Sequence, residues 1–433
     1  MADNSTQPSK PPVDKPTVDK PTVNSPVLSN PALNNQRLGN PIAGQETAWV
    51  KDHLGHLCSD EPVASPRFRG TQRAADAALA AFDVTGYAAK RSEVLPVQRR
   101  GASALSPWIR HGHLSLPRVW AATKGPSRDV EKFRDELLWQ EYARHTYARL
   151  GKAMQKPIRY QPVEPGVKHD PWDRSMHCVA SVLDELETDG WMVNQTRMWM
   201  ASQWTVRHGA KWREGEDRFF QHLLDGSRAA NRLGWQWTVG AGTGKPYGFA
   251  RWQVEKRAPR MCESCAHRNN CPIEKWPVEQ TLVAAPQDTR IRSLQNPATV
   301  SGPLEPRISG EPEAVWITAE SLGDDDPALR AHPELPVIFV FDEPLLCGLS
   351  LSGKRLVFLA ERLAELAQTR ELTIHCGDPV DILTGRKLAT TYAPVPGWRA
   401  RANVIEPTAV YPWPWLRVPG TESIASFSAW NKR

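Results

Sequence analysis

The chain has 433 residues, of which 40% are hydrophobic and 24% are charged, and its net charge is +6. This length suits two or three domains with buried cores. We find no apolar run of the ~18 residues that a membrane span needs and no apolar secretory signal, so we expect a cytoplasmic protein without membrane contact. The mildly basic charge permits nucleic-acid binding without requiring it. Seven cysteines, an odd number, argue against a disulfide framework.

Residues 1–58 are predicted to form a disordered tail. Pro, Asn, Ser and Thr dominate its first 45 residues, the sequence Lys-Pro-Thr-Val occurs twice there, and Trp49 is its first aromatic residue. Such a segment has too little apolar surface to offset the entropy that ordering the chain would cost.

Residues 59–277 are predicted to be helical, because apolar residues recur there at spacings of three and four. The clearest periodic segments are 73–82, 127–150, 178–186, 194–207 and 217–224. A linker rich in Pro, Gly and polar residues follows over 278–312.

Residues 313–433 change in character. Buried strands are predicted at 315–318, 337–341 and 372–376, with an amphipathic helix at 353–368. Strands that alternate with a helix indicate a parallel sheet. The expected fold class is therefore an all-helical domain followed by a short Rossmann-like α/β domain.

The stretch 197–244 contains five tryptophans, which are Trp199, Trp204, Trp212, Trp235 and Trp237. Tryptophan is large and rarely buried completely, and its N–H group needs a partner. So many indoles beside Asn, Arg and Asp indicate a site that stacks on planar rings or passes electrons.

Motifs in this stretch resemble the flavin-binding core of the DNA photolyase/cryptochrome family. They are residues 194–198 (NQTRM), 212–216 (WREGE), 223–231 (LLDGSRAAN) and 234–237 (GWQW). The resemblance is strong over 65–260 and implies a helical FAD-binding domain. A weaker resemblance over 313–430 implies a shortened version of the family's α/β antenna domain, which normally precedes the helical domain. The resemblance also implies a monomer, and it leaves the antenna chromophore unassigned.

By this resemblance, eight residues would contact FAD: Tyr87, Ser103, Leu105, Gln140, Asn194, Arg197, Asp225 and Asn231. The small-residue loop 101–107 opens a helix, where free backbone N–H groups suit a pyrophosphate. Arg197 and Asp225 would pair beside the flavin ring, and Asn231 would lie near flavin N5. Four family residues are replaced here, by Ala102, Gln140, Gln195 and Ser227.

The resemblance implies UV-damaged DNA as the partner. Trp139 and Trp237 would stack on a flipped pyrimidine dimer, and Glu136 would bind its base edge. Met198 and Arg251 would complete the substrate site. Taken alone, Trp139 also suits core packing, and Arg251 suits an ordinary surface position.

Trp235 and Trp212 match the inner two of the family's electron-relay tryptophans, while the third is not placed. Together with Asn231 and Glu136, these two indoles form the predicted catalytic set. The flavin would carry the chemistry, and the protein would supply position and electrostatics.

Cys262, Cys265 and Cys271 have the spacing C-x2-C-x5-C, which indicates a metal site in a reduced compartment. The Cys-Pro pair that ends it favours a [4Fe–4S] cluster, and zinc is the rival. Cys178 is the expected fourth ligand, by resemblance to bacterial photolyase-like proteins that carry such a cluster. His267 is the alternative and would favour zinc.

The resulting hypothesis is a deoxyribodipyrimidine photo-lyase, in which reduced FAD passes an electron to a flipped pyrimidine dimer under blue light. The class of dimer is not assigned. One alternative is a cryptochrome-like blue-light sensor without repair activity. Another is a metal-stabilised nucleic-acid-binding protein without flavin.

Overall fold

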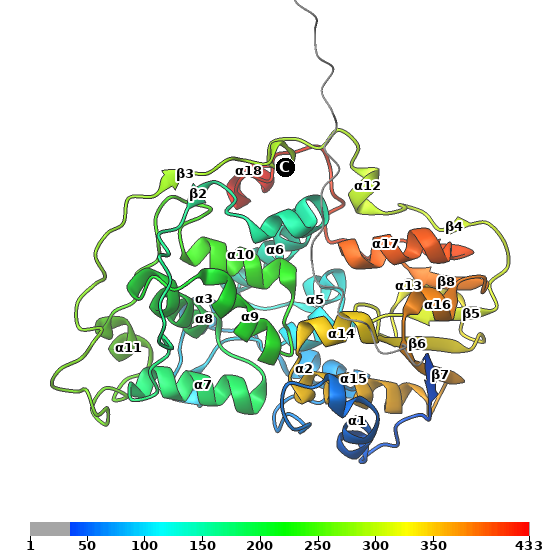
Figure 1. The fold of residues 1–433 in the computed structure, drawn as a ribbon, viewed down its shortest axis with the longest axis horizontal. Coiled ribbons are helices and arrows are strands. Elements are labelled where there is room, and N and C mark those ends of the chain that lie inside the picture. Colours follow the sequence, from blue (N-terminus) through cyan, green and yellow to red (C-terminus); the bar gives the residue numbers. More distant parts are fainter. Residues whose placement is uncertain (1–34, 433) are drawn as a thin grey trace, which may run out of the picture. The chain divides into compact units, whose positions relative to one another are not determined.

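The computed structural model describes residues 35–432, in which a helical region adjoins a seven-stranded sheet (Figure 1). The predicted mixture of α and α/β structure is confirmed. Within the described range, no helix is long and apolar enough to cross a membrane.

The helical region lies between Gln72 and Arg257. Its helices are α2 (Gln72–Ala81), α3 (Tyr87–Lys90), α4 (Ser106–Arg110), α5 (Leu116–Ala122), α6 (Ser127–Leu150), α7 (His177–Asp189), α8 (Asn194–Ala201), α9 (Trp212–His222), α10 (Arg228–Thr238) and α11 (Arg251–Arg257). The long α6 ends at Gly151, whose φ of 56° suits a glycine. A π-helical turn at Ser202–Arg207 continues α8, and such turns are frequent at functional sites.

The sheet has the strand order β1-β7-β6-β5-β8-β9-β4. Its central strands are parallel: β5 (Ala314–Ile317), β6 (Val337–Asp342), β7 (Leu372–Gly377), β8 (Leu388–Thr391) and β9 (Ala409–Tyr411). The edge strands β1 (Gln36–Leu38) and β4 (Arg307–Ile308) are antiparallel to their neighbours. The parallel arrangement predicted from the sequence is therefore confirmed.

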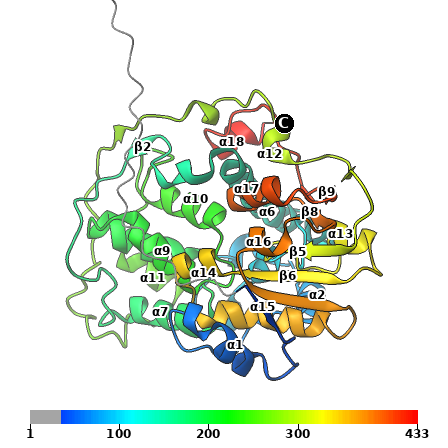
Figure 2. The same ribbon diagram turned by 45° about the vertical axis from the view of Figure 1, so that its right-hand side comes forward.

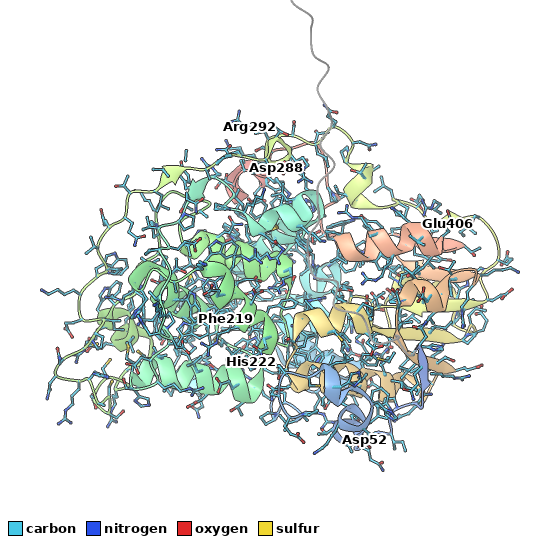
Figure 3. All side chains as sticks on the ribbon, viewed as in Figure 1. Asp52, Phe219, His222, Asp288, Arg292 and Glu406 are labelled. Atoms are coloured by element: carbon cyan, nitrogen blue, oxygen red, sulfur yellow. The ribbon has the colours of Figure 1, made fainter. Side chains whose placement is uncertain are left out.

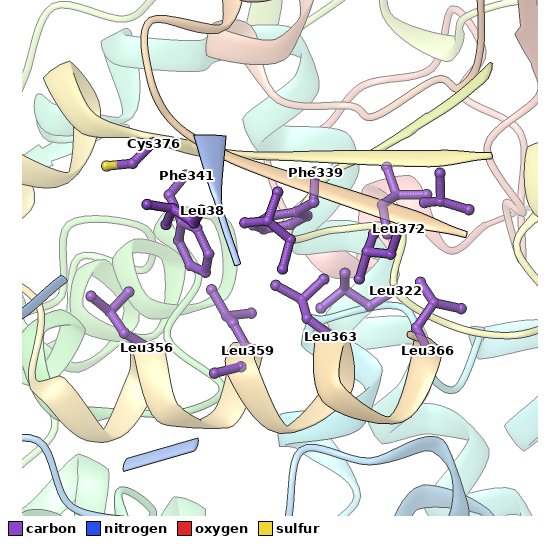
Figure 4. Packing of buried hydrophobic residues seen from close by; sticks show 14 of the residues in the cluster. Leu38, Leu322, Phe339, Phe341, Leu356, Leu359, Leu363, Leu366, Leu372 and Cys376 are labelled. Carbon is purple, nitrogen blue, oxygen red and sulfur yellow. The ribbon is translucent and has the colours of Figure 1, made fainter. Parts of the chain in front are cut away.

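Helices cover both faces of the sheet (Figures 1 and 2). The helix α15 (Gly353–Leu366) places leucines on one face at spacings of three and four, where they pack against Phe339 and Phe341 of β6 (Figure 4). The other face contacts α16 (Pro379–Leu383) and α17 (Pro396–Ile405) through Ile338 and Trp398. Shorter helices α13 (Pro327–Ala331) and α14 (Glu343–Leu349) follow β5 and β6.

Residues 35–58, which the composition assigned to a disordered tail, instead belong to the α/β part of the fold. The strand β1 pairs with β7. The helix α1 (Glu46–Leu54) buries Trp49, Val50 and Leu54, and the Trp49 Nε1–H donates to the carbonyl of Gly39 at 2.8 Å. The amino-acid composition averaged over the whole polar segment concealed the short apolar face of α1. The earlier part of the predicted tail lies outside the described residues.

The predicted linker also contains ordered elements. The strand β3 (Val283–Ala284) pairs with β2 (Tyr160–Gln161), and β4 pairs with β9. After β9, residues 413–431 run back to α6 and end in α18 (Phe427–Trp430). We call residues 413–431 the return segment.

Candidate functional site

A cavity of about 1580 Å³ lies among α6, α8, α10 and the loops that follow β5 and β6. Its lining includes most of the predicted flavin and lesion residues, which are Tyr87, Ser103, Glu136, Trp139, Gln140, Asn194, Arg197, Met198, Asp225, Asn231, Trp235 and Trp237. The cavity is larger than the ~300–1,000 Å³ of ordinary ligand pockets. The sequence motifs therefore converge on one large site.

The turn between α9 and α10 carries the first charged pair of the cavity. Arg197 Nη2 on α8 donates to Asp225 Oδ2 at 2.7 Å. Asp225 is largely buried, and its Oδ1 has no hydrogen-bond partner among residues 35–432. A buried acceptor of this kind is costly unless a ligand or water satisfies it. The predicted pairing of Arg197 and Asp225 is thus present, with one oxygen left for a ligand.

Two further arginines bind the same turn, and sequence reasoning missed both. Arg110 Nε and Arg355 Nη2 each donate to the carbonyl of Gly226 at 3.0 Å. Arg355 comes from α15 and is buried, and desolvation lowers its pKa to about 9. The turn is therefore fixed by α4, α8 and α15 together. No local sequence signal connects Arg355 with residues 129 positions earlier.

Asn231 is held by Glu216, which sequence reasoning did not identify as a site residue. Its Nδ2 donates to the backbone oxygen and to Oε1 of Glu216, each at 3.0 Å. Glu216 is fully buried and also pairs with Arg228 Nη1 at 2.6 Å. Because its donor group is engaged, Asn231 has its carbonyl oxygen left to accept a hydrogen bond from a ligand.

The two predicted FAD contacts in the loop 101–107 point in different directions. Ser103 lines the cavity, whereas the Leu105 side chain is fully buried in the hydrophobic core with Trp108 and Leu137. The expected FAD contact of Leu105 is therefore not supported for its side chain. The Leu105 side chain points into the core because its apolar surface is buried against α6.

The predicted lesion residues lie on α6 and α10. Trp237 is 38% exposed, and its ring lies 5.5 Å from that of Tyr247. Glu136 is fixed by two cations, with Oε1 3.3 Å from Arg91 Nε and 3.1 Å from Lys132 Nζ. The carboxylate therefore remains at the cavity wall without being free to move far.

Arg251 lies elsewhere. Its guanidinium pairs with Glu255 and Glu274, each at 2.9 Å, and these carboxylates raise its pKa. It lines a second, small cavity beside the cysteines instead of the large one. The expectation that Arg251 contacts the lesion is therefore wrong for this structure, because two local carboxylates hold it.

Trp235 is buried and lines the large cavity, whereas Trp212 is buried away from it. A different indole lies behind Trp235, because a side chain at Gly215 would meet Trp235 at 2.3 Å and Trp204 at 3.0 Å. The ring of Trp204 lies 4.7 Å from that of Trp172. Phe219 of α9, labelled in Figure 3, also contacts Trp235 with a ring separation of 5.1 Å.

Cys178, Cys262, Cys265 and Cys271 all line the small second cavity, as does His267. Cys178 is in the first turn of α7, and burial raises its pKa to about 12. His267 Nε2 is 2.8 Å from the hydroxyl of Ser175. In the part of the chain that the structure describes, no group of three or more His, Cys, Asp and Glu side chains has an arrangement that could hold a metal ion.

Comparison with known proteins identifies the helical region. Residues 133–254 match the FAD binding domain of DNA photolyase. The deoxyribodipyrimidine photo-lyase of Agrobacterium fabrum is 33% identical over 156 residues, 32% of each chain. The cryptochrome DASH of Idiomarina loihiensis is 27% identical over 235 residues, 49% of this chain and 50% of its own.

A crystal structure of a bacterial class III photolyase from Agrobacterium tumefaciens is 28% identical, with a TM-score of 0.37, over 43% of this chain and 42% of its own. The chain thus spans a third to a half of the length of these relatives. The match over residues 133–254 falls in the region where the sequence motifs predicted a flavin-binding core.

Replacement of Asp225 by Ala should remove FAD from the purified protein. The change leaves Arg197 without its carboxylate, at a cost near the lower end of the ~3–5 kcal/mol for a broken buried pair, because Arg197 is partly exposed. Flavin absorbance per chain measures the occupancy. Asp184→Ala, on the exposed side of α7, is the control and should keep its FAD. Full occupancy in Asp225→Ala would contradict the assignment.

The return segment is bound to α6 by a buried carboxyl group. Glu141 Oε1 accepts from the backbone N–H groups of Leu416 and Arg417, at 2.7 and 3.0 Å. Burial raises the pKa of Glu141 to about 7, from an ordinary 4.5. The folded protein therefore holds this proton more tightly than the unfolded chain, and the contribution of Glu141 to stability decreases as pH rises from about 4.5 through 7.

Glu141→Gln keeps the acceptor oxygen and removes this titration. Relative to the wild type, the variant should gain about 2–3 kcal/mol of unfolding free energy between pH 4.5 and pH 8. Urea denaturation at both pH values measures the difference. Glu131→Gln, at an exposed position of α6, should give no such trend. A pH-independent difference for Glu141→Gln would contradict the buried, proton-binding state.

Proposed function

We propose that the protein is a light-driven DNA repair flavoprotein that acts on pyrimidine dimers. The observation that carries the proposal is the shared cavity: Trp139, Trp237 and Glu136 line the same space as Arg197 and Asn231. A lesion bound between the indoles would therefore lie beside the flavin site. The names of relatives that are photo-lyases support the same activity.

The chain's own residues would hold and orient both molecules. Asp225 Oδ1 and the carbonyl of Asn231 are acceptors for flavin N–H or hydroxyl groups, and the Arg197 cation would stabilise negative charge on the reduced flavin. Ser103 would bind the pyrophosphate. When bound and reduced, FAD supplies the light-excited electron donor that this chemistry requires.

The substrate side would be built by stacking and one hydrogen bond. Trp139 and Trp237 would offer aromatic faces to a flipped pyrimidine dimer, and base–aromatic stacking is worth about 1–3 kcal/mol per base. Glu136, held by Arg91 and Lys132, would accept from a base edge. A damaged pair costs less to extrude than an intact one, which would give selectivity for UV-damaged DNA.

A second candidate function is blue-light sensing without repair. It is favoured by Phe427, which covers one face of Trp139 in the present structure. Gln140 and Ser227 also replace polar residues of the family pattern. Both functions would keep the flavin and the indole Trp235 at the cavity wall, so that lesion binding is what separates them.

Alanine at Trp139 or Trp237 should weaken binding of a dimer-containing oligonucleotide by roughly 5- to 150-fold. FAD content should stay normal, because neither indole is assigned to the flavin. Trp252→Ala, an exposed indole outside the cavity, is the matched control. Binding and illuminated repair are compared for both main classes of UV dimer and for undamaged DNA. If the reduced wild type neither prefers nor repairs either class, the sensor function replaces repair.

The second cavity would hold a [4Fe–4S] cluster bound by Cys178, Cys262, Cys265 and Cys271. The fit rests on four thiols around one small buried space. A cluster binds each cysteine to a separate iron, whereas a zinc ion needs all its sulfurs at ~2.3 Å. The Cys-Pro pair that ends the cysteine motif favours the cluster over zinc.

Purified protein should contain about four iron and four sulfide per chain. Cys178→Ser should lose most of both, and Cys347→Ser, at an exposed position of α14, should lose neither. One zinc without iron would contradict the cluster. Unchanged iron in Cys178→Ser would contradict Cys178 as the fourth ligand and direct attention to His267.

A further inference from the structure

Phe427 lies flat on the indole of Trp139. The ring centroids are 4.0 Å apart, and the planes differ by 8°. Both side chains are partly exposed and both line the large cavity. A parallel ring at this separation takes up the space that a stacked base would need on that face of Trp139.

The residues on either side of Phe427 are fixed to α6. The hydroxyl of Tyr142 donates to the carbonyl of Ile424 at 2.7 Å. Trp430 is almost fully buried, and its Nε1–H donates to His145 Nδ1 at 2.9 Å. Phe427 therefore extends into the cavity from a short stretch that is attached on both sides, so that its ring is kept close to Trp139.

The helix that carries the second proposed wall, Trp237, contacts the same cluster as Phe427. Leu233 of α10 packs in the same cluster as Trp139 and Phe427. Residues four apart share one face of a helix, so that Trp237 follows Leu233 on the face that contacts this cluster. Phe427 and the helix that carries Trp237 thus contact the same cluster.

We propose that Phe427 is an intramolecular occupant of the lesion-stacking position, and that a flipped base stacks on Trp139 only after this ring turns away. The proposal rests on the repair function and concerns access to the same site. Ring–ring and base–ring stacking have similar strengths. Because the ring is tethered, its effective concentration is high.

The ring would therefore compete with every extruded base, damaged or not. An undamaged base also has to break its pairing and stacking, whereas a dimer has already lost much of both. Because Phe427 competes in the free protein, it would lower the affinity for damaged and undamaged bases by the same factor, and the preference for the dimer would come from the lower cost of extruding it. Phe427 would act as a residue that controls access to the stacking position, without contact to the reacting atoms.

The first test compares affinities of the full-length, FAD-bound protein for single-stranded oligonucleotides with and without one cyclobutane thymine dimer. Phe427→Ala should bind the dimer about 2- to 12-fold more tightly than the wild type, because the competing stack is removed. Phe427→Trp, which keeps a stacking ring, should not gain affinity. Ser428→Ala, the neighbouring cavity residue without a ring, should match the wild type. Weaker dimer binding by Phe427→Ala that Phe427→Trp restores would overturn the proposal and make Phe427 a permanent wall.

The second test observes the ring itself. With para-fluorophenylalanine at position 427 alone, the fluorine resonance of the free protein should shift when Trp139 is replaced by Ala, because the indole ring current is lost. Addition of the dimer oligonucleotide should move the resonance, and undamaged oligonucleotide should move it less. The proposal would be overturned if the fluorine resonance does not shift in Trp139→Ala, or if it does not shift when the dimer binds.

The two tests separate this proposal from the repair function. If neither the wild type nor Phe427→Ala prefers the dimer, while the fluorine resonance still depends on Trp139, the stack exists but the cavity is no lesion site. That result overturns repair and the competition together. Normal dimer preference with no effect of Phe427→Ala overturns the competition alone.

Discussion

The turn that joins α9 to α10 is the point on which the site depends. Its Asp225 carboxylate binds Arg197, and the carbonyl of Gly226 accepts from Arg110 and from Arg355. Glycine suits position 226, because a Cβ there would come within 2.7 Å of the backbone oxygen of Leu223 and 2.9 Å of the Arg355 guanidinium. Buried cations need such acceptors, since an unpaired charge in the protein interior is strongly unfavourable. The turn and the three arginines therefore stabilise one another.

The same contacts join the helical region to the sheet. Arg355 belongs to α15, whose leucines pack on β6, and Arg110 Nη2 pairs with Glu320 Oε1 at 3.0 Å in the loop after β5. A shift of α15 would thus move the carboxylate of Asp225 in the cavity wall. The flavin side of the site is positioned by residues that come from both parts of the fold.

Local patterns in the sequence predicted much of this arrangement. The spacing of apolar residues identified α6, α15 and the parallel strands β5, β6 and β7, and the family motifs brought Arg197, Asp225 and Asn231 to one cavity. The sequence did not predict the direction in which individual side chains point. A motif alignment does not distinguish a ligand contact from a core residue, and Leu105 faces the core.

Long-range contacts are the part that the sequence did not reveal. Phe427 meets Trp139 across 288 positions, and β1 joins a strand more than 330 positions later. Arg251 shows the opposite error, because a motif suggested a distant role while Glu255, one helical turn away, binds it. The periodicity of the sequence predicts which residues share a face of one helix or strand. Contacts between residues of different elements depend on the whole fold.

The central claim is that one cavity holds both the flavin and the damaged base. It can be tested by titrating the reduced, FAD-bound protein with a dimer-containing oligonucleotide in the dark while recording the flavin absorption spectrum. Because the dimer would replace solvent beside the flavin, we expect a difference spectrum that saturates with dimer binding and is absent with undamaged DNA. Tight dimer binding without any change in the flavin bands would contradict the shared cavity.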